Sequence, residues 1–199
     1  LKTFDVDMNK KILLDIGSST GGFTDVALQN GAALSYALDV GYNQLAWKLR
    51  QDERVVVMER TNFRYSKLAD FEKGQPNFAT IDVSFISLKL ILPPLHDILT
   101  DDGDVVALIK PQFEAGKEYV GKKGIIKDPK THLMVLEDIT DFAMTHGFNV
   151  QELTFSPITG GEGNIEFLAH LKKVPERGSL NPKIDLTNIV SEAHQQLDK

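Results

Sequence analysis

Three charged side chains stand at or beside apolar segments, where a buried charge is costly unless it is paired or faces a cleft. Asp82 ends one apolar run, Lys110 ends the run 105–109, and Glu166 lies within the apolar stretch that follows Asn164. A lysine whose charge is tuned by neighbouring acids and burial can act on a substrate hydroxyl group. The alternatives are an ion pair that only fixes loop geometry, and a strand glutamate that faces water.

A glycine-bearing segment, Gly17-Ser-Ser-Thr-Gly21-Gly22, separates an apolar run from a helical pattern. Glycines in that position let the backbone approach a ligand closely. Ser19 replaces the second glycine of the dinucleotide fingerprint, and no Lys-Ser/Thr pair follows as in a P-loop. Asp39, one strand later, is placed to accept hydrogen bonds from ribose hydroxyls. With Asp15 beside the loop, this pattern favours a phosphate-free nucleoside cofactor such as S-adenosylmethionine over a tight turn with a surface acid.

Apolar runs bounded by turn residues recur at the spacing of strand–helix units. They predict buried parallel strands at 11–16, 33–40, 55–59, 78–83 and 105–110. Helical patterns lie at 22–30, 43–51, 88–99 and 131–146, and segments 149–155 and 165–172 predict an antiparallel edge hairpin. We therefore expect an α/β fold with a doubly wound, mostly parallel, seven-stranded, Rossmann-like sheet. Ligands of such sheets bind at the carboxyl ends of the strands.

The composition is that of a globular protein: 199 residues, 42% hydrophobic, with no cysteine and a net charge of −6. The absence of cysteine excludes disulfides and thiolate metal sites and suits a reducing cytoplasm, and we expect no metal site. No signal peptide opens the chain, and the most apolar stretch, 88–95, is too short to cross a bilayer. We predict a cytoplasmic protein that does not enter membranes.

The overall acidity argues against nucleic-acid binding by a general positive field, but a local basic face is present. A glycine-bearing stretch beside the candidate site is rich in lysine: Lys117, Lys122, Lys123, Lys127 and Lys130. These side chains are a candidate contact for a phosphate backbone. A solvated loop is the alternative.

Several long segments resemble the TlyA family of FtsJ-like class I methyltransferases. They are 14–64, which holds Asp-Ile-Gly-Ser-Ser-Thr-Gly-Gly-Phe-Thr-Asp; Ile-Asp-Val-Ser-Phe-Ile-Ser at 81–87; Ile-Lys-Pro-Gln-Phe-Glu-Ala-Gly at 109–116; and 156–166. The resemblance covers nearly all of the chain to Lys172. It implies S-adenosylmethionine-dependent transfer to a ribose 2′-hydroxyl of ribosomal RNA, on cytidine.

The resemblance also implies a catalytic Lys-Asp-Lys-Glu set, whose last three members match Asp82, Lys110 and Glu166. The family's first lysine normally lies just before the first strand, and its role is not transferred to Lys2. The implied cofactor residues are Asp15, Gly17, Ser18, Ser19, Thr20, Gly21, Gly22, Phe23, Asp39 and Asn62. We expect a methyltransferase domain at 1–173, then a linker and terminal helix at 174–199. The family's amino-terminal S4 RNA-binding domain is not in this sequence, which resembles a catalytic domain taken from a longer protein.

Three other functions remain open. An amino-methyltransferase would carry an Asn/Asp-Pro-Pro-aromatic element after the fourth strand, where this chain has Asp82-Val-Ser-Phe85. A membrane-lytic protein is suggested by the "hemolysin" label that many family members carry, but no amphipathic basic helix supports it. A nucleotide-dependent dehydrogenase is disfavoured by the missing glycine at position 19.

Overall fold

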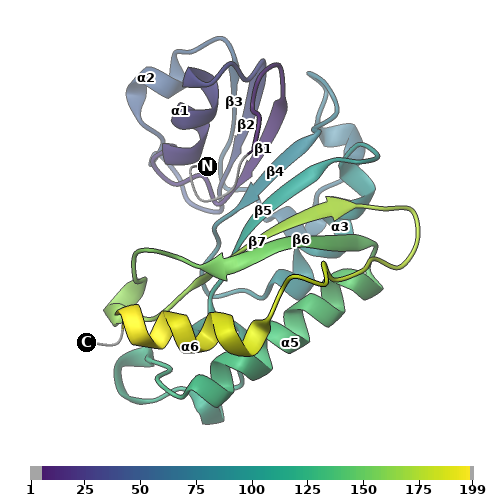
Figure 1. Ribbon diagram of the computed structural model, residues 1–199. Coiled ribbons are helices and arrows are strands. Elements are labelled where there is room, and N and C mark those ends of the chain that lie inside the picture. Colours follow the sequence, from purple (N-terminus) through teal and green to yellow (C-terminus); the bar gives the residue numbers. More distant parts are fainter. Residues whose placement is uncertain (1–5, 198–199) are drawn as a thin grey trace.

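A single mixed sheet of seven strands, in the order β3-β2-β1-β4-β5-β7-β6, forms the centre of the molecule (Figure 1). This is seen in a computed structural model that describes residues 6–197. The strands are β1 (Ile12–Ile16), β2 (Leu34–Leu38), β3 (Val55–Met58), β4 (Phe78–Ile81), β5 (Asp104–Ile109), β6 (Phe148–Phe155) and β7 (Phe167–Lys173). β1 to β5 are parallel, and β7 runs antiparallel between β5 and β6. The predicted α/β class and the closing antiparallel hairpin are confirmed.

Helices cover both faces of the sheet, and strand alternation decides which residues meet them. The helices are α1 (Gly22–Gln29), α2 (Trp47–Arg50), α3 (Leu92–Ile98), α4 (Pro111–Glu114), α5 (Pro129–Thr145) and α6 (Leu186–Leu197). In β1, Leu14 and Ile16 join the larger core under α3, α5 and α6, whereas Leu13 packs in the smaller core with α1. Figure 1 shows α1 and α2 over the β1–β3 side only. At β6 and β7 no helix of residues 6–197 lies over the same face of the sheet, and it carries polar side chains such as His170.

Two predicted helices are shorter than expected, and one strand begins later. Only 47–50 of the expected helix 43–51 is helical, because Asn43 has a positive φ of 61° and its N–H binds the carboxylate of Glu59. The expected helix 88–99 is divided into a 3-10 turn at Leu88–Leu90 and α3, which has proline in its first turn. After β3, where no helix was predicted, the chain forms 3-10 turns at Phe63–Tyr65 and Leu68–Asp70. β7 begins at Phe167, so Glu166 precedes the strand.

The segment 174–181 follows β7 and lies along the outer strand β6. Leu180 makes a parallel bridge with Val150, and the N–H of Val150 donates to the carbonyl of Ser179 at 2.9 Å. α6 then packs on α5 and contributes Val190 and Ala193 to the larger core. The carboxyl-terminal segment is thereby fixed on the same sheet as the rest of the chain. Within residues 6–197, no helix has the length and apolarity needed to span a membrane.

Candidate functional site

The strand register brings the predicted residues to one edge of the sheet. β1 ends level with both β2 and β4, so the residues that follow these strands, Gly17, Asp39 and Asp82, lie close together. β5 and β7 pair through Ile109 and Phe167, which makes Lys110 and Glu166 neighbours across that pair. The three catalytic candidates therefore come from the ends of β4 and β5 and the start of β7. The first lysine of the family's set is assigned to no residue of this sequence, and Lys2, to which its role is not transferred, lies outside the described residues.

Lys110 and Asp82 form an ion pair at this edge. The Lys110 Nζ lies 2.6 Å from Oδ1 of Asp82 and 3.3 Å from Oγ of Ser84. The lysine side chain is only 12% exposed and the aspartate side chain 38%, so solvent screens the pair less than it would at an open surface. The predicted pairing of these two residues is present. The ammonium group is held by the segment that follows β4.

Glu166 lies in the same region but meets a different partner. Its carboxylate accepts a hydrogen bond from Nε2 of Gln112 at 2.8 Å, and the residue is 8% exposed. A Cβ atom at Gly160 would overlap the Glu166 carboxylate, so this glycine lets the backbone pass directly beside it. Glu166 therefore does not face open water, and the alternative of a water-facing strand glutamate is wrong.

A cavity of about 280 Å³ lies over the ends of β1, β2 and β4. Its lining residues are Ile16, Gly17, Ser19, Leu38, Asp39, Val40, Gln44, Thr61, Asn62, Phe63, Asp82, Val83, Ser84, Phe85, Ile86 and Ile91. Asp39 is oriented by two backbone donors, the N–H of Ser19 at 2.5 Å and that of Gly41 at 2.9 Å. We call this space the first cavity. It contains two carboxylates and neither lysine nor arginine.

Gly17 explains how the loop after β1 fits against the segment after β4. Its φ is 81°, and a Cβ atom there would overlap the carbonyl oxygen of Asp82. Any larger residue would therefore be strained and would push apart the two segments that line the first cavity. This glycine is required for close approach of backbone to backbone.

The predicted cofactor residues divide into two groups. Gly17, Ser19, Asp39 and Asn62 line the first cavity. The others, which do not line it, are Asp15, Ser18, Thr20, Gly21, Gly22 and Phe23. Gly21 instead provides space for Leu45 and Leu49, and the carbonyl of Thr20 accepts a hydrogen bond from Ala46 at 3.0 Å. These loop residues dock the loop on α2 and begin α1.

Asp15 is fully buried beneath the loop. Its carboxylate accepts hydrogen bonds from Oγ1 of Thr24 at 2.8 Å and Oγ1 of Thr80 at 3.0 Å. Burial raises the pKa of Asp15 to about 6, the hydrogen bonds from Thr24 and Thr80 act in the opposite direction, and the charge of Asp82 raises it further. In β1, Asp15 shares the face of Leu13, which points to α1, so its carboxylate joins α1 to the sheet.

A second cavity, of about 520 Å³, adjoins the first. Its lining residues are Asp82, Ser84, Phe85, Leu108, Lys110, Gln112, Phe113, Lys123, Gly124, Ser156, Ile158, Thr159, Gly160, Gly161, Glu162, Asn164 and Glu166. Asp82, Ser84 and Phe85 belong to both linings and form a wall between the two spaces. All three predicted catalytic residues line the second cavity.

Phe85 and Gln112 have roles that the sequence did not indicate. Phe85 is 90% exposed, has a φ of 62°, and its ring centroid lies 4.8 Å from that of Phe113. A bulky residue held in that conformation and exposed in a cavity wall is unusual, and such strain gathers at functional sites. Both residues lie inside the family-like segments, but a motif alone does not show exposure or partners.

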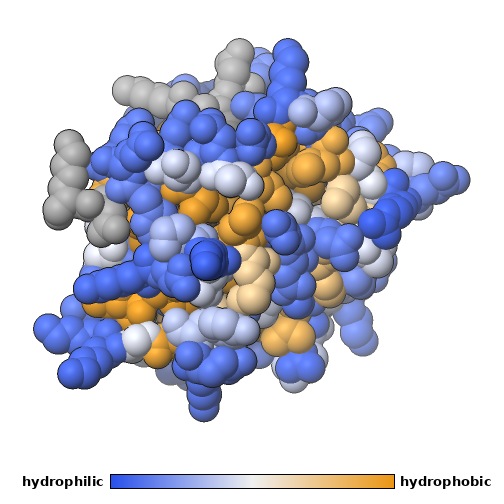
Figure 2. Space-filling view, turned by 60° about the horizontal axis from the view of Figure 1, so that its bottom comes forward, coloured by the Kyte–Doolittle hydropathy of each residue, from blue (hydrophilic) through white to orange (hydrophobic). Residues whose placement is uncertain are grey.

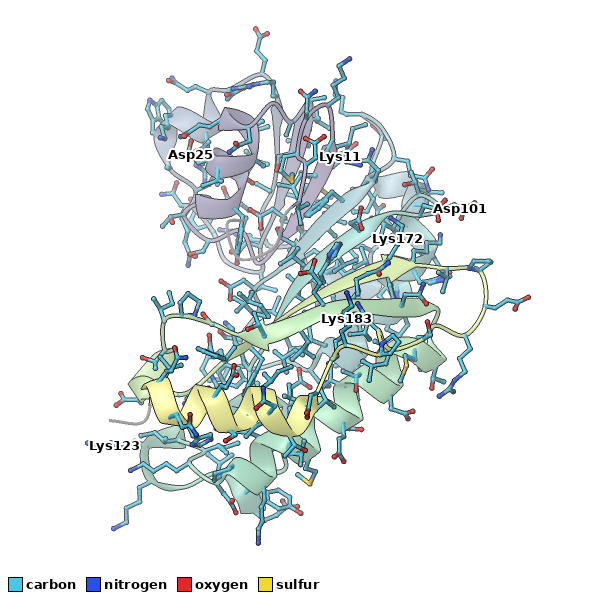
Figure 3. All side chains as sticks on the ribbon, in the orientation of Figure 1. Lys11, Asp25, Asp101, Lys123, Lys172 and Lys183 are labelled. Carbon is cyan, nitrogen blue, oxygen red and sulfur yellow. The ribbon has the colours of Figure 1, made fainter. Side chains whose placement is uncertain are left out.

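The lysine-rich segment extends from Lys117 into the first turn of α5, and its Lys123 lines the second cavity. Lys117, Lys122, Lys123, Lys127 and Lys130 are all exposed, and none forms an ion pair with a described residue. Figure 3 places Lys123 at the far end of the molecule from Asp101. Asn164 anchors the segment: its Nδ2 donates to Gly124 and Gly161, and its Oδ1 accepts from Ile126 at 3.0 Å.

The surface around these elements is mixed in character. Figure 2, which brings the lower side of Figure 1 forward, shows apolar patches interrupted by hydrophilic residues.

Known proteins share both the sequence and this fold. The chain is 63% identical over 199 residues to YqxC of Bacillus subtilis, described as a candidate rRNA methyltransferase. That match covers 99% of the chain and 71% of YqxC. It is 41% identical over 177 residues to TlyA of Mycobacterium tuberculosis, named a 16S/23S rRNA (cytidine-2′-O)-methyltransferase. That match covers 89% of the chain and 66% of TlyA, so the chain spans about two thirds of this relative's length.

A solved structure from Streptococcus thermophilus, described as a candidate hemolysin, superposes with a TM-score of 0.96 at 56% identity. The superposition covers 100% of this chain and 71% of that one. The family model of FtsJ-like methyltransferases matches residues 1–173. The chain therefore belongs to the FtsJ-like methyltransferase family.

Proposed function

We propose that this chain transfers the methyl group of S-adenosylmethionine to a ribose 2′-hydroxyl of ribosomal RNA, on a cytidine. The observation that carries the proposal is the pair of Lys110 and Asp82 at the wall shared by the two cavities. A methyl donor in the first cavity and a ribose in the second would meet at that wall. A relative named as a cytidine-2′-O-methyltransferase supports the choice of acceptor.

The first cavity fits a cationic, phosphate-free nucleoside. It has two aspartates and no basic side chain, which suits a sulfonium ion and disfavours a pyrophosphate. Asp39 is preoriented by its two backbone donors, and each carboxylate oxygen keeps acceptor capacity for a ribose hydroxyl. Leu38, Val40 and Phe63 supply apolar surface for a base. When bound, S-adenosylmethionine supplies an electrophilic methyl group.

Lys110 is the residue that would act on the hydroxyl. Its Nζ is held by Asp82 and Ser84, which leaves one N–H direction for the 2′-oxygen. There the ammonium group would stabilise the negative charge that develops on the 2′-oxygen as its proton passes to water. The methyl–sulfur bond of the donor would break as the oxygen–methyl bond forms. Glu166 completes the acidic surroundings of the lysine. Alignment of the two reactants contributes most, an effect of up to about 7–11 kcal/mol in well-oriented reactions.

The RNA would reach the second cavity past the lysine-rich segment. Lys117, Lys122, Lys123, Lys127 and Lys130 offer unpaired charges for phosphates at its rim, and Lys123 itself lines the cavity. Phe85 offers a ring face for a base. We further propose that 1–173 is the catalytic domain, that 174–199 is its carboxyl-terminal extension, and that an upstream S4 domain adds RNA affinity. Such an enzyme would work in the cytoplasm, where ribosomal RNA is accessible.

Replacing Lys110 tests this proposal. In the full-length protein, Lys110→Ala should lower the rate of rRNA methylation by about 10²–10⁴-fold, the usual contribution of a proton-handling group. Calorimetry should show unchanged S-adenosylmethionine affinity, because Lys110 lines only the second cavity. Lys89→Ala is a suitable control, since Lys89 pairs with Asp138 at the surface. Wild-type rates for Lys110→Ala would refute the role.

The choice of acceptor needs its own measurement. Ribosomal RNA with its 2′-hydroxyls blocked should accept no methyl groups from the wild-type protein. Methylation of that blocked RNA would instead identify an amino-methyltransferase. Leakage of liposomes caused by the purified protein would favour a membrane-lytic function.

A further inference from the structure

The carboxylate of Glu166 depends on one side-chain donor. Nε2 of Gln112 lies 2.8 Å from Oε2 of Glu166, and no described lysine or arginine forms an ion pair with this carboxylate. On its other side the backbone of Gly160 leaves no room even for a Cβ atom. The carboxylate is therefore confined between a glycine backbone and a single amide.

The carboxylate also decides which way the amide of Gln112 faces. The reverse orientation would place Oε1 of Gln112 against Oε2 of Glu166, and both atoms are acceptors. With Nε2 turned toward Glu166, Oε1 of Gln112 is buried and has no hydrogen-bond partner among the described residues. A buried acceptor without a donor is unfavourable. Gln112 thus keeps the orientation in which its Nε2 donates to Glu166, although its own Oε1 is left without a donor among the described residues.

We infer that Gln112 is a positioning residue, which keeps the carboxylate of Glu166 directed into the second cavity where Lys110 lies. This inference rests on the proposed function, because it gives Glu166 its task beside the lysine. Without the amide of Gln112, no described side chain would fix the direction of this carboxylate. The other charged groups that line the cavity are Asp82, Lys110, Lys123 and Glu162.

The short helix α4 makes this positioning rigid. Lys110 is its N-cap residue, so Lys110 and Gln112 lie on one turn and move together. Two residues further on, Glu114 accepts hydrogen bonds from Oγ of Ser87 at 2.5 Å and from the N–H of Leu88 at 2.9 Å. These bonds tie α4 to the segment after β4. The single turn of α4 therefore fixes the positions of Lys110, Asp82 and Glu166 relative to one another.

The first experiment removes the donor but keeps the side-chain volume. In the full-length protein, Gln112→Met should lower kcat for rRNA methylation by about 10²-fold, the effect of misplacing a reacting group by about 1 Å. The KM for RNA should stay within about threefold, because the amide of Gln112 is engaged by Glu166 and the proposed phosphate contacts belong to the lysine-rich segment. Gln75→Met is a matched control: Gln75 also makes one amide hydrogen bond, to the carbonyl of Ile98 at 3.1 Å, and lies away from both cavities.

The second experiment removes the donor in a different way. Gln112→Glu replaces the amide donor by an acceptor in nearly the same shape, so it can no longer donate to Glu166. It should lower kcat for rRNA methylation at least as much as Gln112→Met, and again leave the KM for RNA within about threefold. If the methionine variant melts too early to be measured, this second variant provides the test.

The outcomes separate the inference from the proposed function. An unchanged kcat in Gln112→Met and Gln112→Glu would overturn the inference. Glu166→Gln tests the proposed function: wild-type activity in that variant removes the glutamate from catalysis, whatever Gln112 does. A loss of kcat at an unchanged KM for RNA in the Gln112 variants, beside a normal Gln75→Met, establishes the positioning role.

Discussion

The Nζ of Lys110 lies 2.6 Å from the carboxylate of Asp82, and the two residues follow adjacent parallel strands. Asp82 therefore sets where the lysine can point. In Asp82→Asn the amide still accepts a hydrogen bond but carries no charge, so we expect kcat to fall by about 10²-fold. Rates of rRNA methylation under single-turnover conditions measure this. Asp101→Asn removes a fully exposed partner of Lys173 and should leave the rate unchanged.

The buried carboxyl of Asp15 gives a prediction on pH. Burial raises its pKa to about 6, from 3.8. The folded state therefore holds this proton more tightly, so the associated stability is complete below pH 3.8 and is lost as the pH rises through about 6. The loss approaches about 3 kcal/mol. Asp15→Asn avoids it, and its melting temperature should exceed that of the wild type at pH 8 but not at pH 4.

Scanning calorimetry across this pH range provides the check on Asp15. Asp25→Asn serves as the control, because the hydrogen bond from Lys48 lowers the pKa of the partly exposed Asp25 carboxyl. The stability that the Asp25 carboxylate contributes is therefore present above pH 3.8 and is lost only under more acidic conditions. A gap between wild type and Asp15→Asn that stays constant from pH 4 to pH 8 would contradict the assignment.

Phe85 should contribute to RNA handling without contributing to stability. Its ring is 90% exposed, so Phe85→Ala should leave the melting temperature nearly unchanged. Loss of one stacked base costs about 1–3 kcal/mol, which predicts roughly 5- to 150-fold weaker productive RNA binding. Phe85→Tyr should keep the RNA binding of the wild type, whereas Phe85→Leu should bind RNA as weakly as Phe85→Ala. Equal activity of the leucine and tyrosine variants would show that no stacking occurs.

The lysine-rich segment predicts a salt effect. A variant with glutamine at Lys117, Lys122, Lys123, Lys127 and Lys130 should bind RNA with a shallower dependence on salt. The slope of log K against log salt should decrease by about 0.7–0.9 for each lysine that contacts a phosphate. Filter binding at several salt concentrations measures it. The matched change of Lys10 and Lys73, which precede β1 and β4 at the opposite edge of the sheet, should keep the wild-type slope.

Asp82, Lys110 and Glu166 could be predicted from the sequence because each charge interrupts an apolar segment beside a strand end. Asp82 and Lys110 follow neighbouring parallel strands, whose carboxyl ends lie at one edge of the sheet. Glu166 precedes the antiparallel β7, which begins at that same edge, and all three residues line the second cavity. The same reasoning was less successful for the glycine loop. Asp15 lies one residue before the end of β1 and faces α1, while Gly17 lies beyond the end and faces the cavity.

Gln112 and Phe85 could not be assigned roles from the sequence. The hydrogen bond of Gln112 joins it to a residue that follows a long helix and a strand, and no local pattern encodes that distance. The exposure of Phe85 depends on its positive φ and on Phe113 behind it. Similarly, propensity favoured a longer helix around Trp47, but the contact between Asn43 and Glu59 from the next strand prevented it.

The wall formed by Asp82, Ser84 and Phe85 divides the molecule along its chain as well as in space. Apart from this wall, the first cavity is built from residues 16–91 and the second from residues 108–166. Under the proposed function, mutations in the later half would therefore alter which nucleotide is accepted and leave the donor cavity unchanged. The three wall residues are the exception, because a substitution at any of them changes the lining of both cavities. Divergence of substrate within the family should accordingly concentrate after Leu108 and spare the wall.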